Sequence, residues 1–385
     1  MQPRLASRGP NEYLIGVPGS RHKLGTPALI LDLDRLDANI ASMAAFAKAH
    51  GYALRPPAKI HKSVEIARLQ IAAGAIGQCC ATIAEAEAMV KGGIPGVMLF
   101  SPVVAEPKLD RLSAMNATVD DLIVVTDSLE NIAQLKAAAK RSGRVLKVMI
   151  DFEVGGGRTG VVDESQAVAL ALRVEQTEGL QYVGVQGYVG NHQAIANYDE
   201  RRIASHNYLA PLVHLVERLS AEGLKPPIVS GGGTGTHEID ADLAVFTEIQ
   251  TGTYIFMDAY YRRAVLRRND PHPFQPSLFV RTSVISAAQP GFVITDAGGK
   301  EVDGTFGVLA PEIYDGAPPD ALYSIVGDDM GRVDFAMEGQ QLPVGAVLNV
   351  LPPHCYQTLI LHPAYHCVRG DDLVDIWPID ALENW

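Results

Sequence analysis

A glycine-rich segment, SGGGTGT at residues 230–236, has the composition of an anion-binding loop. Glycines leave the backbone N–H groups uncovered, so several of them can approach one negative charge, and a threonine hydroxyl adds a further donor. No lysine follows the glycines, so the segment is not a Walker-type nucleotide loop. A tight turn that needs positive φ angles would use the same glycines, and the segment alone does not separate these two interpretations.

Lys59 ends the short run LRPPAK at residues 54–59. An unpaired ammonium group is costly to bury, whereas a lysine that forms an imine with an aldehyde escapes part of that cost and supplies covalent catalysis. Taken alone, Lys59 would also fit a surface or salt-bridged position, and His61 and Lys62 lie close by in the sequence. A lysine at one strand end and an anion-binding loop at another together describe a phosphorylated aldehyde cofactor held at both ends.

Other polar side chains that suit a ligand site follow the expected strands. Arg158 comes after the glycine triplet of EVGGGRTGV, and Tyr188 and His192 stand at the end of QGYVGNH. The segment TGTYIFMD contributes Tyr254 and Asp258. In a barrel of parallel strands the functional residues gather at the C-terminal strand ends, so we expect these side chains to share one face with Lys59.

The elements that position these residues alternate between short β-branched runs and Ala- and Leu-rich segments with helical spacing. Strands and helices that alternate at about 25–40 residues are typical of parallel βαβ units. With the first run (28–33) left outside, eight strands are expected, the number that closes a (β/α)8 barrel; they cover residues 54–59, 76–82, 97–102, 121–127, 145–152, 182–188, 226–233 and 246–254. An open doubly wound sheet would show the same alternation.

The alternation stops near Tyr260, and from about residue 275 the chain shows only strand and turn patterns, closely punctuated by Pro and Gly. This composition predicts a separate β domain. We therefore expect an α/β protein in three parts: an arm with the start of the β domain at 1–27, the (β/α)8 barrel at 28–264 and a C-terminal β domain at 265–385.

Several of these motifs together resemble the family of D-threonine aldolase, D-3-hydroxyaspartate aldolase and eukaryotic-type D-serine dehydratase. The resemblance runs from about Thr26 to Ile379 and rests on TPALILDLDRLDANI, LRPPAKIHK, EVGGGRTGV, GVQGYVG, SGGGTGT and TGTYIFMD. It implies an alanine-racemase-like, fold-type III enzyme that binds pyridoxal 5'-phosphate (PLP) in its barrel. It also implies a small amino acid as substrate, and a homodimer.

The resemblance assigns a role to each of the matching residues. Lys59 would form the Schiff base with PLP, the backbone of Gly232 and Gly233 with Thr234 would bind its phosphate, and Tyr254 would lie at that phosphate. The remaining two residues would contact the ring, with Tyr188 by the pyridine nitrogen and Arg158 near the ring hydroxyl.

The chain also departs from the family pattern at several histidines. Pro57, Val189 and Met330 stand where relatives have histidine. The family's C-terminal metal motif, H-x-D or H-x-C, reads His354-Cys355-Tyr356 in this chain. A neutral tyrosine, with an ordinary pKa near ~10, is a poor metal ligand. On a strand, Cys355 would face away from His354 while Tyr356 faces the same side. We therefore expect no divalent metal at His354, and we expect His354 and Tyr356 to act as a general acid/base pair. Two structural alternatives stay open: His354 as a remnant that is hydrogen-bonded to a backbone carbonyl, and Tyr356 as a residue that only fills the vacated metal space.

Three functions are compatible with these residues. The first is a lyase on β-hydroxy-D-amino acids, which either cleaves the substrate to glycine and an aldehyde or eliminates the β-hydroxyl group. The second is a metal-independent racemase or epimerase, in which Lys59 and Tyr356 are the two bases. The third is a non-catalytic PLP carrier, but such proteins of this fold usually lack a large C-terminal β domain.

The bulk composition excludes other classes of protein. The net charge is -12, and an acidic chain gains little from binding phosphate backbones, so we expect no nucleic-acid partner. No apolar run reaches the roughly 18 residues that a membrane span needs, and the N-terminal arm has no apolar stretch typical of a secretory signal. The four cysteines contain no CxxC pair, and Cys79 and Cys80 are adjacent, so a reducing cytoplasm is expected.

Overall fold

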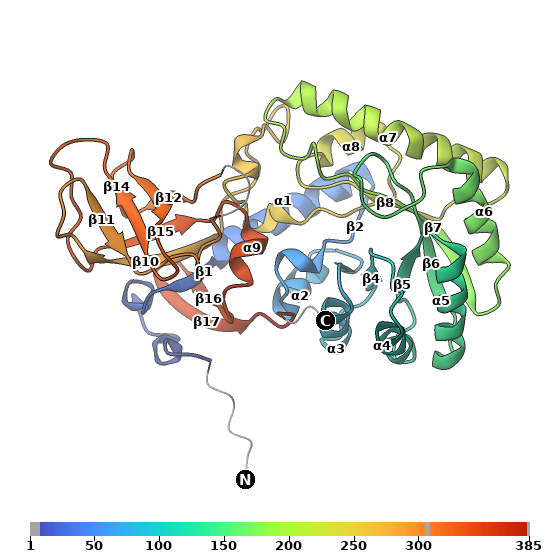
Figure 1. Ribbon diagram of the computed structural model, residues 1–385, viewed down its shortest axis with the longest axis horizontal. Coiled ribbons are helices and arrows are strands. Elements are labelled where there is room, and N and C mark those ends of the chain that lie inside the picture. The colour runs from blue at the N-terminus through green and yellow to red at the C-terminus, as the bar shows by residue number, and fades with distance from the viewer. Residues whose placement is uncertain (1–7, 305–308, 383–385) are drawn as a thin grey trace, which may run out of the picture. The chain divides into compact units, whose positions relative to one another are not determined.

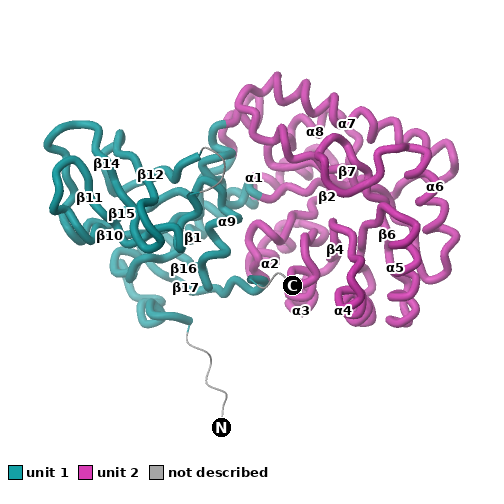
Figure 2. The backbone as a smooth tube through the Cα atoms, in the orientation of Figure 1, with its two compact units in different colours: residues 1–40, 253–263, 274–382 teal, residues 41–252, 264–273, 383–385 magenta. Residues whose placement is uncertain are grey.

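The computed structural model describes residues 8–304 and 309–382. The chain divides into two compact units, shown in Figure 2: unit 1 contains residues 1–40, 253–263 and 274–382, and unit 2 contains residues 41–252, 264–273 and 383–385. Residues 1–7 of the expected N-terminal arm lie outside the described residues.

Unit 2 is built on eight parallel strands, each close to one of the eight expected runs. Figure 1 labels β2 and the series from β4 to β8. The order of the eight strands in the sheet is β2-β9-β8-β7-β6-β5-β4-β3, and a parallel bridge from Pro57 to Cys79 joins the two ends of this series. The predicted (β/α)8 barrel is therefore confirmed, and the open doubly wound sheet is excluded. The strands are β2 (Ala53–Leu54), β3 (Cys79–Cys80), β4 (Met98–Leu99), β5 (Ile123–Thr126), β6 (Leu146–Asp151), β7 (Leu180–Gly187), β8 (Ile228–Gly231) and β9 (Glu248–Ile249).

Helices alternate with these strands, and side-chain caps mark where several of them begin. The hydroxyls of Thr82 and Ser128 accept the N–H groups of Glu85 and Asn131, three residues further on, which satisfies one of the unpaired donors of each helix start. The helices are α1 (Leu33–His50), α2 (Val64–Ala72), α3 (Ile83–Lys91), α4 (Glu106–Asn116), α5 (Leu129–Ser142), α6 (Glu164–Glu175), α7 (Tyr198–Ala221) and α8 (His237–Leu243).

The barrel strands are short but almost completely buried, as expected for parallel strands covered on both faces. All four residues of β5 are buried. A cluster of apolar side chains from β3 to β7 fills this part of the unit: Cys79, Met98, Phe100, Ile123, Val125, Met149 and Val183. The chemistry-bearing residues are therefore carried on a rigid, densely packed support.

Unit 1 is built on a nine-stranded, mainly antiparallel sheet, which confirms the predicted β domain. Strands β13-β14-β11-β10-β1-β16-β17 form its main path, and β15 pairs with both β10 and β12. A short helix, α9 (Cys355–Leu359), follows β15. The strands are β1 (Ala28–Asp32), β10 (Leu278–Ser286), β11 (Phe292–Thr295), β12 (Glu312–Asp315), β13 (Leu322–Ile325), β14 (Gly331–Asp334), β15 (Val347–Leu351), β16 (Ala364–Arg369) and β17 (Asp372–Pro378).

Strand β1 lies in this sheet, although we expected residues 28–264 to form the barrel domain. It pairs antiparallel with β10, Leu29 opposite Val280, and parallel with β16, Ile30 opposite His366. A strand followed by a helix has the local pattern of a barrel unit. Only its partners, about 250 and 335 residues away in sequence, decide which sheet it joins.

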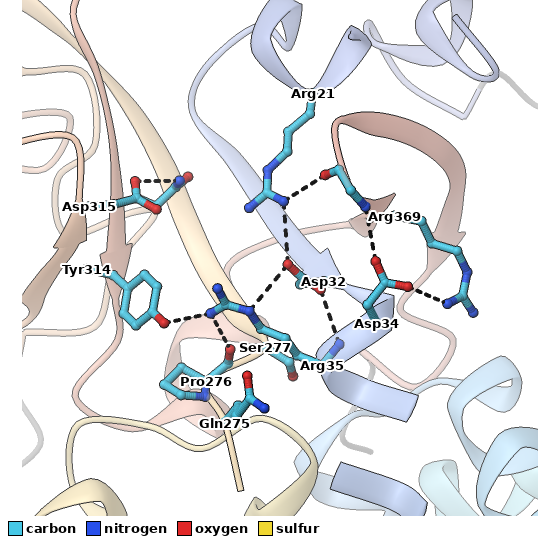
Figure 3. Close-up of polar contacts among 12 residues, drawn as sticks. Arg21, Asp32, Asp34, Arg35, Gln275, Pro276, Ser277, Tyr314, Asp315 and Arg369 are labelled. Carbon is cyan, nitrogen blue, oxygen red and sulfur yellow. Dashed lines mark hydrogen bonds and ion pairs between the residues drawn. The ribbon is translucent and has the colours of Figure 1, made fainter. Parts of the chain in front are cut away.

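A buried carboxylate fixes the end of β1 (Figure 3). Asp32 has a side chain only 8% exposed and is paired with two guanidinium groups, that of Arg21 at 3.4 Å and that of Arg35 at 3.6 Å. Arg35 also donates to the hydroxyl of Tyr314 and to the carbonyl of Pro276. Because a buried charge is tolerated when it is paired and hydrogen-bonded, this cluster fixes the start of α1 to the strands of unit 1.

Within the described part of the chain, no helix combines the length and the apolar character that crossing a membrane requires.

Candidate active site

Lys59 lies at the C-terminal end of the first barrel strand, as predicted, in a short 3-10 helix (Ala58–Ile60) that follows β2. Burial lowers the pKa of its amine from the ordinary value, and the nearby Arg158 guanidinium lowers it further. The Nζ atom lies 5.4 Å from the centre of the Phe100 ring. An amine with a lowered pKa is neutral for more of the time and is a better nucleophile near neutral pH, which suits imine formation.

A small cavity of about 30 Å³ surrounds this amine. It is lined by Pro57, Lys59, Phe100, Arg158, Tyr188 and Gln250. The structure thus brings together three predicted residues, Lys59, Arg158 and Tyr188, and the Arg158 guanidinium lies 4.7 Å from the centre of the Tyr188 ring. Sequence analysis missed Phe100 and Gln250, because both lay inside expected strands (97–102 and 246–254), whereas the observed strands β4 and β9 end directly before them.

The loop that carries Arg158 is folded around its own carboxylate. Glu153 accepts hydrogen bonds from the backbone N–H groups of Gly157 at 3.1 Å and Arg158 at 3.0 Å, and also from Gly155 and Gly156. Burial acts to raise the pKa of Glu153, but these backbone donors outweigh it and hold the pKa below the ordinary value. The glycines let the chain wrap closely around the carboxylate, which fixes the direction in which Arg158 leaves the loop.

The glycine-rich segment begins where β8 ends, as predicted, and a carboxylate lies beneath it. Gly232 has φ +67°, and a Cβ atom there would stand 2.5 Å from Asp240 Oδ2. Asp240 accepts hydrogen bonds from the Thr236 hydroxyl at 2.6 Å and from the backbone of Gly233. Gly232 therefore has the positive φ angle of a tight turn, and its missing β-carbon leaves room for the close approach of Asp240. Burial raises the pKa of Asp240 to about 7.

Gln193, which lies outside this segment in the sequence, is hydrogen-bonded to another part of it. Its Oε1 accepts the backbone N–H of Gly235 at 2.9 Å, and its Nε2 donates to the Thr236 hydroxyl at 2.9 Å. The neighbouring His192 is buried 5.2 Å from the Tyr208 ring, and burial lowers its pKa to about 4. No other described residue hydrogen-bonds either ring nitrogen of His192.

The barrel residues fit a PLP molecule in two respects. The Lys59 amine is enclosed and has no hydrogen-bond acceptor among the described residues, which suits a nitrogen that becomes an imine. The glycine segment forms a tight turn at the end of β8 in which only glycine fits, because a β-carbon at Gly232 or Gly233 would stand 2.5 Å from the side chain of Asp240 or Gln193. Lys62, the alternative lysine, is not available, because it is fully buried and paired with Glu85 at 2.7 Å.

Unit 1 contains the other predicted catalytic residues, and here one argument was wrong. We expected a strand at residues 354–356 with Cys355 facing away from His354. Instead His354 is the residue before α9, and the chain turns into a helix at Cys355. Ligand atoms of Asp258, His354 and Cys355 therefore lie within 4.8 Å of one another, close enough to hold a metal ion.

These three residues are already hydrogen-bonded to one another through Asp258. The His354 Nδ1 atom lies 2.6 Å from Asp258 Oδ2, and the Cys355 backbone N–H donates to the same oxygen at 3.2 Å. Burial raises the pKa of the Cys355 thiol well above its ordinary value, so the thiolate that binds metals is disfavoured. A histidine whose Nδ1 is bonded to a carboxylate keeps Nε2 for a ligand, so the absence of a divalent ion stays a prediction that rests on Tyr356 in the metal motif.

Two predicted tyrosines also lie in unit 1. Tyr356 is half-buried in the first turn of α9. Tyr254 is buried in a 3-10 helix (Thr253–Ile255), with its ring 5.6 Å from that of Phe274. The role of Tyr254 at a phosphate and those of Tyr356 and His354 in proton transfer stay predictions.

Comparison with known proteins supports the resemblance. Residues 31–260 match the model of the alanine racemase N-terminal domain, and residues 277–368 match a serine dehydratase domain. The 3-hydroxy-D-aspartate aldolase of Paracoccus denitrificans (strain Pd 1222) is 36% identical over 95% of this chain and 94% of its own. The D-threo-3-hydroxyaspartate dehydratase of Delftia sp. (strain HT23) is 30% identical over 94% of this chain and 98% of its own.

A solved structure agrees with these sequence matches. The D-threonine aldolase from Filomicrobium marinum superimposes with a TM-score of 0.88 at 33% identity, over 94% of this chain and 96% of that one. The predicted family and fold are confirmed: the chain belongs to the alanine-racemase-like family, and it is similar over nearly its full length to aldolases and dehydratases of D-hydroxyamino acids.

Proposed function

We propose that this chain is a PLP-dependent lyase that cleaves β-hydroxy-D-amino acids by a retro-aldol reaction, giving glycine and an aldehyde. One observation carries the proposal: Lys59, with a lowered pKa, shares a cavity with Arg158 and Tyr188 at the end of a barrel strand. The chain around this cavity is also similar over nearly its full length to proteins named as aldolases.

In this proposal the barrel residues hold the cofactor. The Lys59 amine binds it covalently, and Arg158 and Tyr188 contact the ring at the ring hydroxyl and the pyridine nitrogen. Gly232, Gly233 and Thr234 bind the phosphate, with Tyr254 beside it. When bound, PLP draws electrons from the substrate's Cα and so weakens the bonds to that atom.

The protein selects the bond that breaks by controlling a proton. Breaking Cα–Cβ requires removal of the proton of the β-hydroxyl group, so that the Cβ–O bond becomes the carbonyl of the aldehyde. We assign this step to Tyr356 and His354, with the His354 ring held by Asp258. No divalent ion takes part in this proposal.

Dehydration is the second candidate, because the Delftia relative is named as a dehydratase. In that reaction the β-hydroxyl leaves as water after loss of the Cα proton, and a keto acid and ammonia are released. Racemisation with Lys59 and Tyr356 as the two bases is the alternative that uses the same residues without breaking Cα–Cβ. The expected homodimer is part of the proposal and is tested by light scattering.

Product analysis separates these reactions. Purified protein loaded with PLP is incubated with D-threonine, D-3-phenylserine and D-3-hydroxyaspartate, with and without a chelator. Glycine plus an aldehyde supports the proposal, and ammonia plus a keto acid supports dehydration instead. Exchange of enantiomers without cleavage, or no reaction with any substrate, contradicts a lyase.

A further inference from the structure

A chain of buried polar side chains runs around part of the barrel, from β6 to β2, and one of its middle members lines the Lys59 cavity. Its members come from neighbouring strands in their spatial order: Asp151 from β6, Gln186 from β7, Ser230 from β8, Glu248 from β9 and Arg55 just after β2. All are buried, and Gln250, which follows β9, connects to them. Gln250 is 7% exposed, and it is the member that lines the cavity.

Arg55, at one end of this chain, can only donate hydrogen bonds, and this determines the direction of the hydrogen bonds that follow. Arg55 donates to both oxygens of Glu248, at 2.9 Å each, so Glu248 is a carboxylate. A carboxylate only accepts, so the Ser230 hydroxyl must donate to it, at 2.7 Å. Ser230 then has only lone pairs left for its other neighbour, which must be a donor.

That neighbour is the carboxamide of Gln250, and its orientation is therefore determined. Its Nε2 donates to Ser230 Oγ at 2.9 Å and to Gln186 Oε1 at 3.1 Å, which uses both N–H bonds. Gln186 is held in turn, because its own Nε2 donates to Asp151 at 2.9 Å and to the carbonyl of Phe100 at 3.1 Å. Turning the Gln250 carboxamide over would place its oxygen against two acceptors, a costly arrangement in a buried site.

The Oε1 atom of Gln250 is consequently a fixed acceptor, and no donor among the described residues hydrogen-bonds it. The same cavity contains the Lys59 amine, a donor without an acceptor among the described residues. Two backbone carbonyls of the lining residues are engaged: that of Phe100 accepts from Gln186, and that of Pro57 from Ile60.

We infer that Gln250 is a positioning residue for Lys59: its Oε1 accepts a hydrogen bond from the Lys59 nitrogen whenever that nitrogen carries a proton. The inference rests on the proposed attachment of the cofactor at Lys59. The hydrogen-bond chain fixes which end of the Gln250 carboxamide is the acceptor, and Gln250 lines the same cavity as Lys59. Gln250 thereby favours the protonated state of the nitrogen, against the effects of burial and of Arg158, while Cys79 and Glu85 act in the same sense as Gln250.

The test measures how the reactivity of Lys59 depends on pH. Full-length protein freed of cofactor is treated with limiting pyridoxal and cyanoborohydride at a series of pH values, and the label on each lysine is quantified by peptide mass spectrometry. Pyridoxal carries no phosphate, so the proposed phosphate contacts of the glycine segment do not affect the labelling of Lys59. The half-maximal pH of labelling at Lys59 reports the protonation of its amine.

Two substitutions at Gln250 are expected to shift this pH in opposite directions. Gln250→Met keeps the length and removes the acceptor, and the half-maximal pH should fall by about one unit, the scale of one hydrogen bond to a charged group. Gln250→Glu places a negative charge beside the amine and should raise the half-maximal pH of labelling. Gln186→Leu, which does not line the cavity, should lower it by a smaller amount because the carboxamide of Gln250 loses one anchor.

Matched measurements separate the possible outcomes. Gln176→Leu, at an exposed position after α6, should leave the profile unchanged. Superimposable profiles for the parent, Gln250→Met and Gln250→Glu, with Lys59 labelled in each, would overturn the inference and leave the proposed function intact. Labelling of the parent at another lysine in place of Lys59 would instead contradict the proposed function, and the inference with it.

Discussion

The carboxylate of Asp258 lies 2.6 Å from the Nδ1 atom of His354 and also accepts the backbone N–H of Cys355 at 3.2 Å. Its second oxygen accepts the backbone N–H of Tyr261 at 3.0 Å. A carboxylate bonded in this way keeps the proton of the ring on Nδ1 and leaves Nε2 in the form that accepts a proton. The pair is therefore arranged for proton transfer at His354, and Asp258 would have to give up these bonds to bind a metal.

Metal analysis should find no stoichiometric divalent ion in protein purified without a metal-binding tag, and a chelator should leave activity unchanged. The reason is that Tyr356, a poor metal ligand when neutral, stands where the metal motif of the relatives has Asp or Cys. Cys355→Ala should likewise change neither metal content nor activity. One zinc, manganese or magnesium ion per chain, together with loss of activity on chelation, would show that the three side chains rearrange to bind it.

Tyr356→Phe should keep the absorption spectrum of the bound cofactor and lower turnover by at least about 100-fold. The substitution keeps the ring and its packing but removes the proton-bearing oxygen, and general acid/base groups are typically worth 10²–10⁴-fold. Steady-state kinetics with the best substrate measure the effect. A racemase would in addition lose isotope exchange more in one direction than in the other. Turnover within about threefold of the parent would exclude the hydroxyl from the mechanism.

Lys59 and Lys62 should behave differently when each is replaced by methionine. Lys59→Met should abolish the absorption near ~420 nm that is typical of PLP bound to a lysine, and should leave the fold intact. Lys62→Met should destabilise the protein by about 3–5 kcal/mol, because it leaves the buried carboxylate of Glu85 unpaired. Absorption spectra and thermal unfolding distinguish the two effects. An unchanged spectrum in Lys59→Met would refute the assignment of the cofactor lysine.

Gly232→Val should reduce the affinity for PLP by several kcal/mol, the scale of losing more than one charge-assisted hydrogen bond at roughly 1.5–3 each. A side chain at this position meets Asp240 and needs a strained φ of +67°. Gly223→Val is the matched control, since it has φ +76° and open space around the position. Titration with PLP and with pyridoxal should show that only Gly232→Val removes the preference for the phosphate. Equal affinity in the variant and the parent would place the phosphate elsewhere.

The Asp240→Asn variant should be more stable toward unfolding than the parent protein, by an amount that depends on pH. The pKa of Asp240 is raised from 3.8 to about 7 by burial. Between these values the folded parent binds a proton that the unfolded chain has lost, so its stability falls as the pH rises. An asparagine does not titrate, so the difference in stability should grow from about pH 4 to about pH 7 and then level off, with a ceiling of roughly 4 kcal/mol. Denaturant unfolding of cofactor-free protein checks this, and a constant difference would contradict it.

Much of the barrel and part of the site could be predicted because they depend on local patterns. The eight strands and the helices between them follow from hydrophobic periodicity. Lys59 and Arg158 lie in the segments that follow β2 and β6, and Tyr188 and Gly232 come directly after β7 and β8. Parallel strands in a barrel bring their C-terminal ends to one face, so a strand end in the sequence already indicates a place in the site. The motifs around these residues also indicated the family.

Tertiary structure alone decided the features that depend on distant partners. Strand β1 joins the sheet of unit 1 because its neighbours, β10 and β16, come from the far end of the chain. Cys355 turns toward Asp258 because a helix begins there, so alternation along a strand does not apply. The orientation of Gln250 follows from hydrogen bonds with residues 20 and 64 positions away. A hydrogen-bond direction is a property of all the groups that meet at one place, and no local pattern in the sequence encodes it.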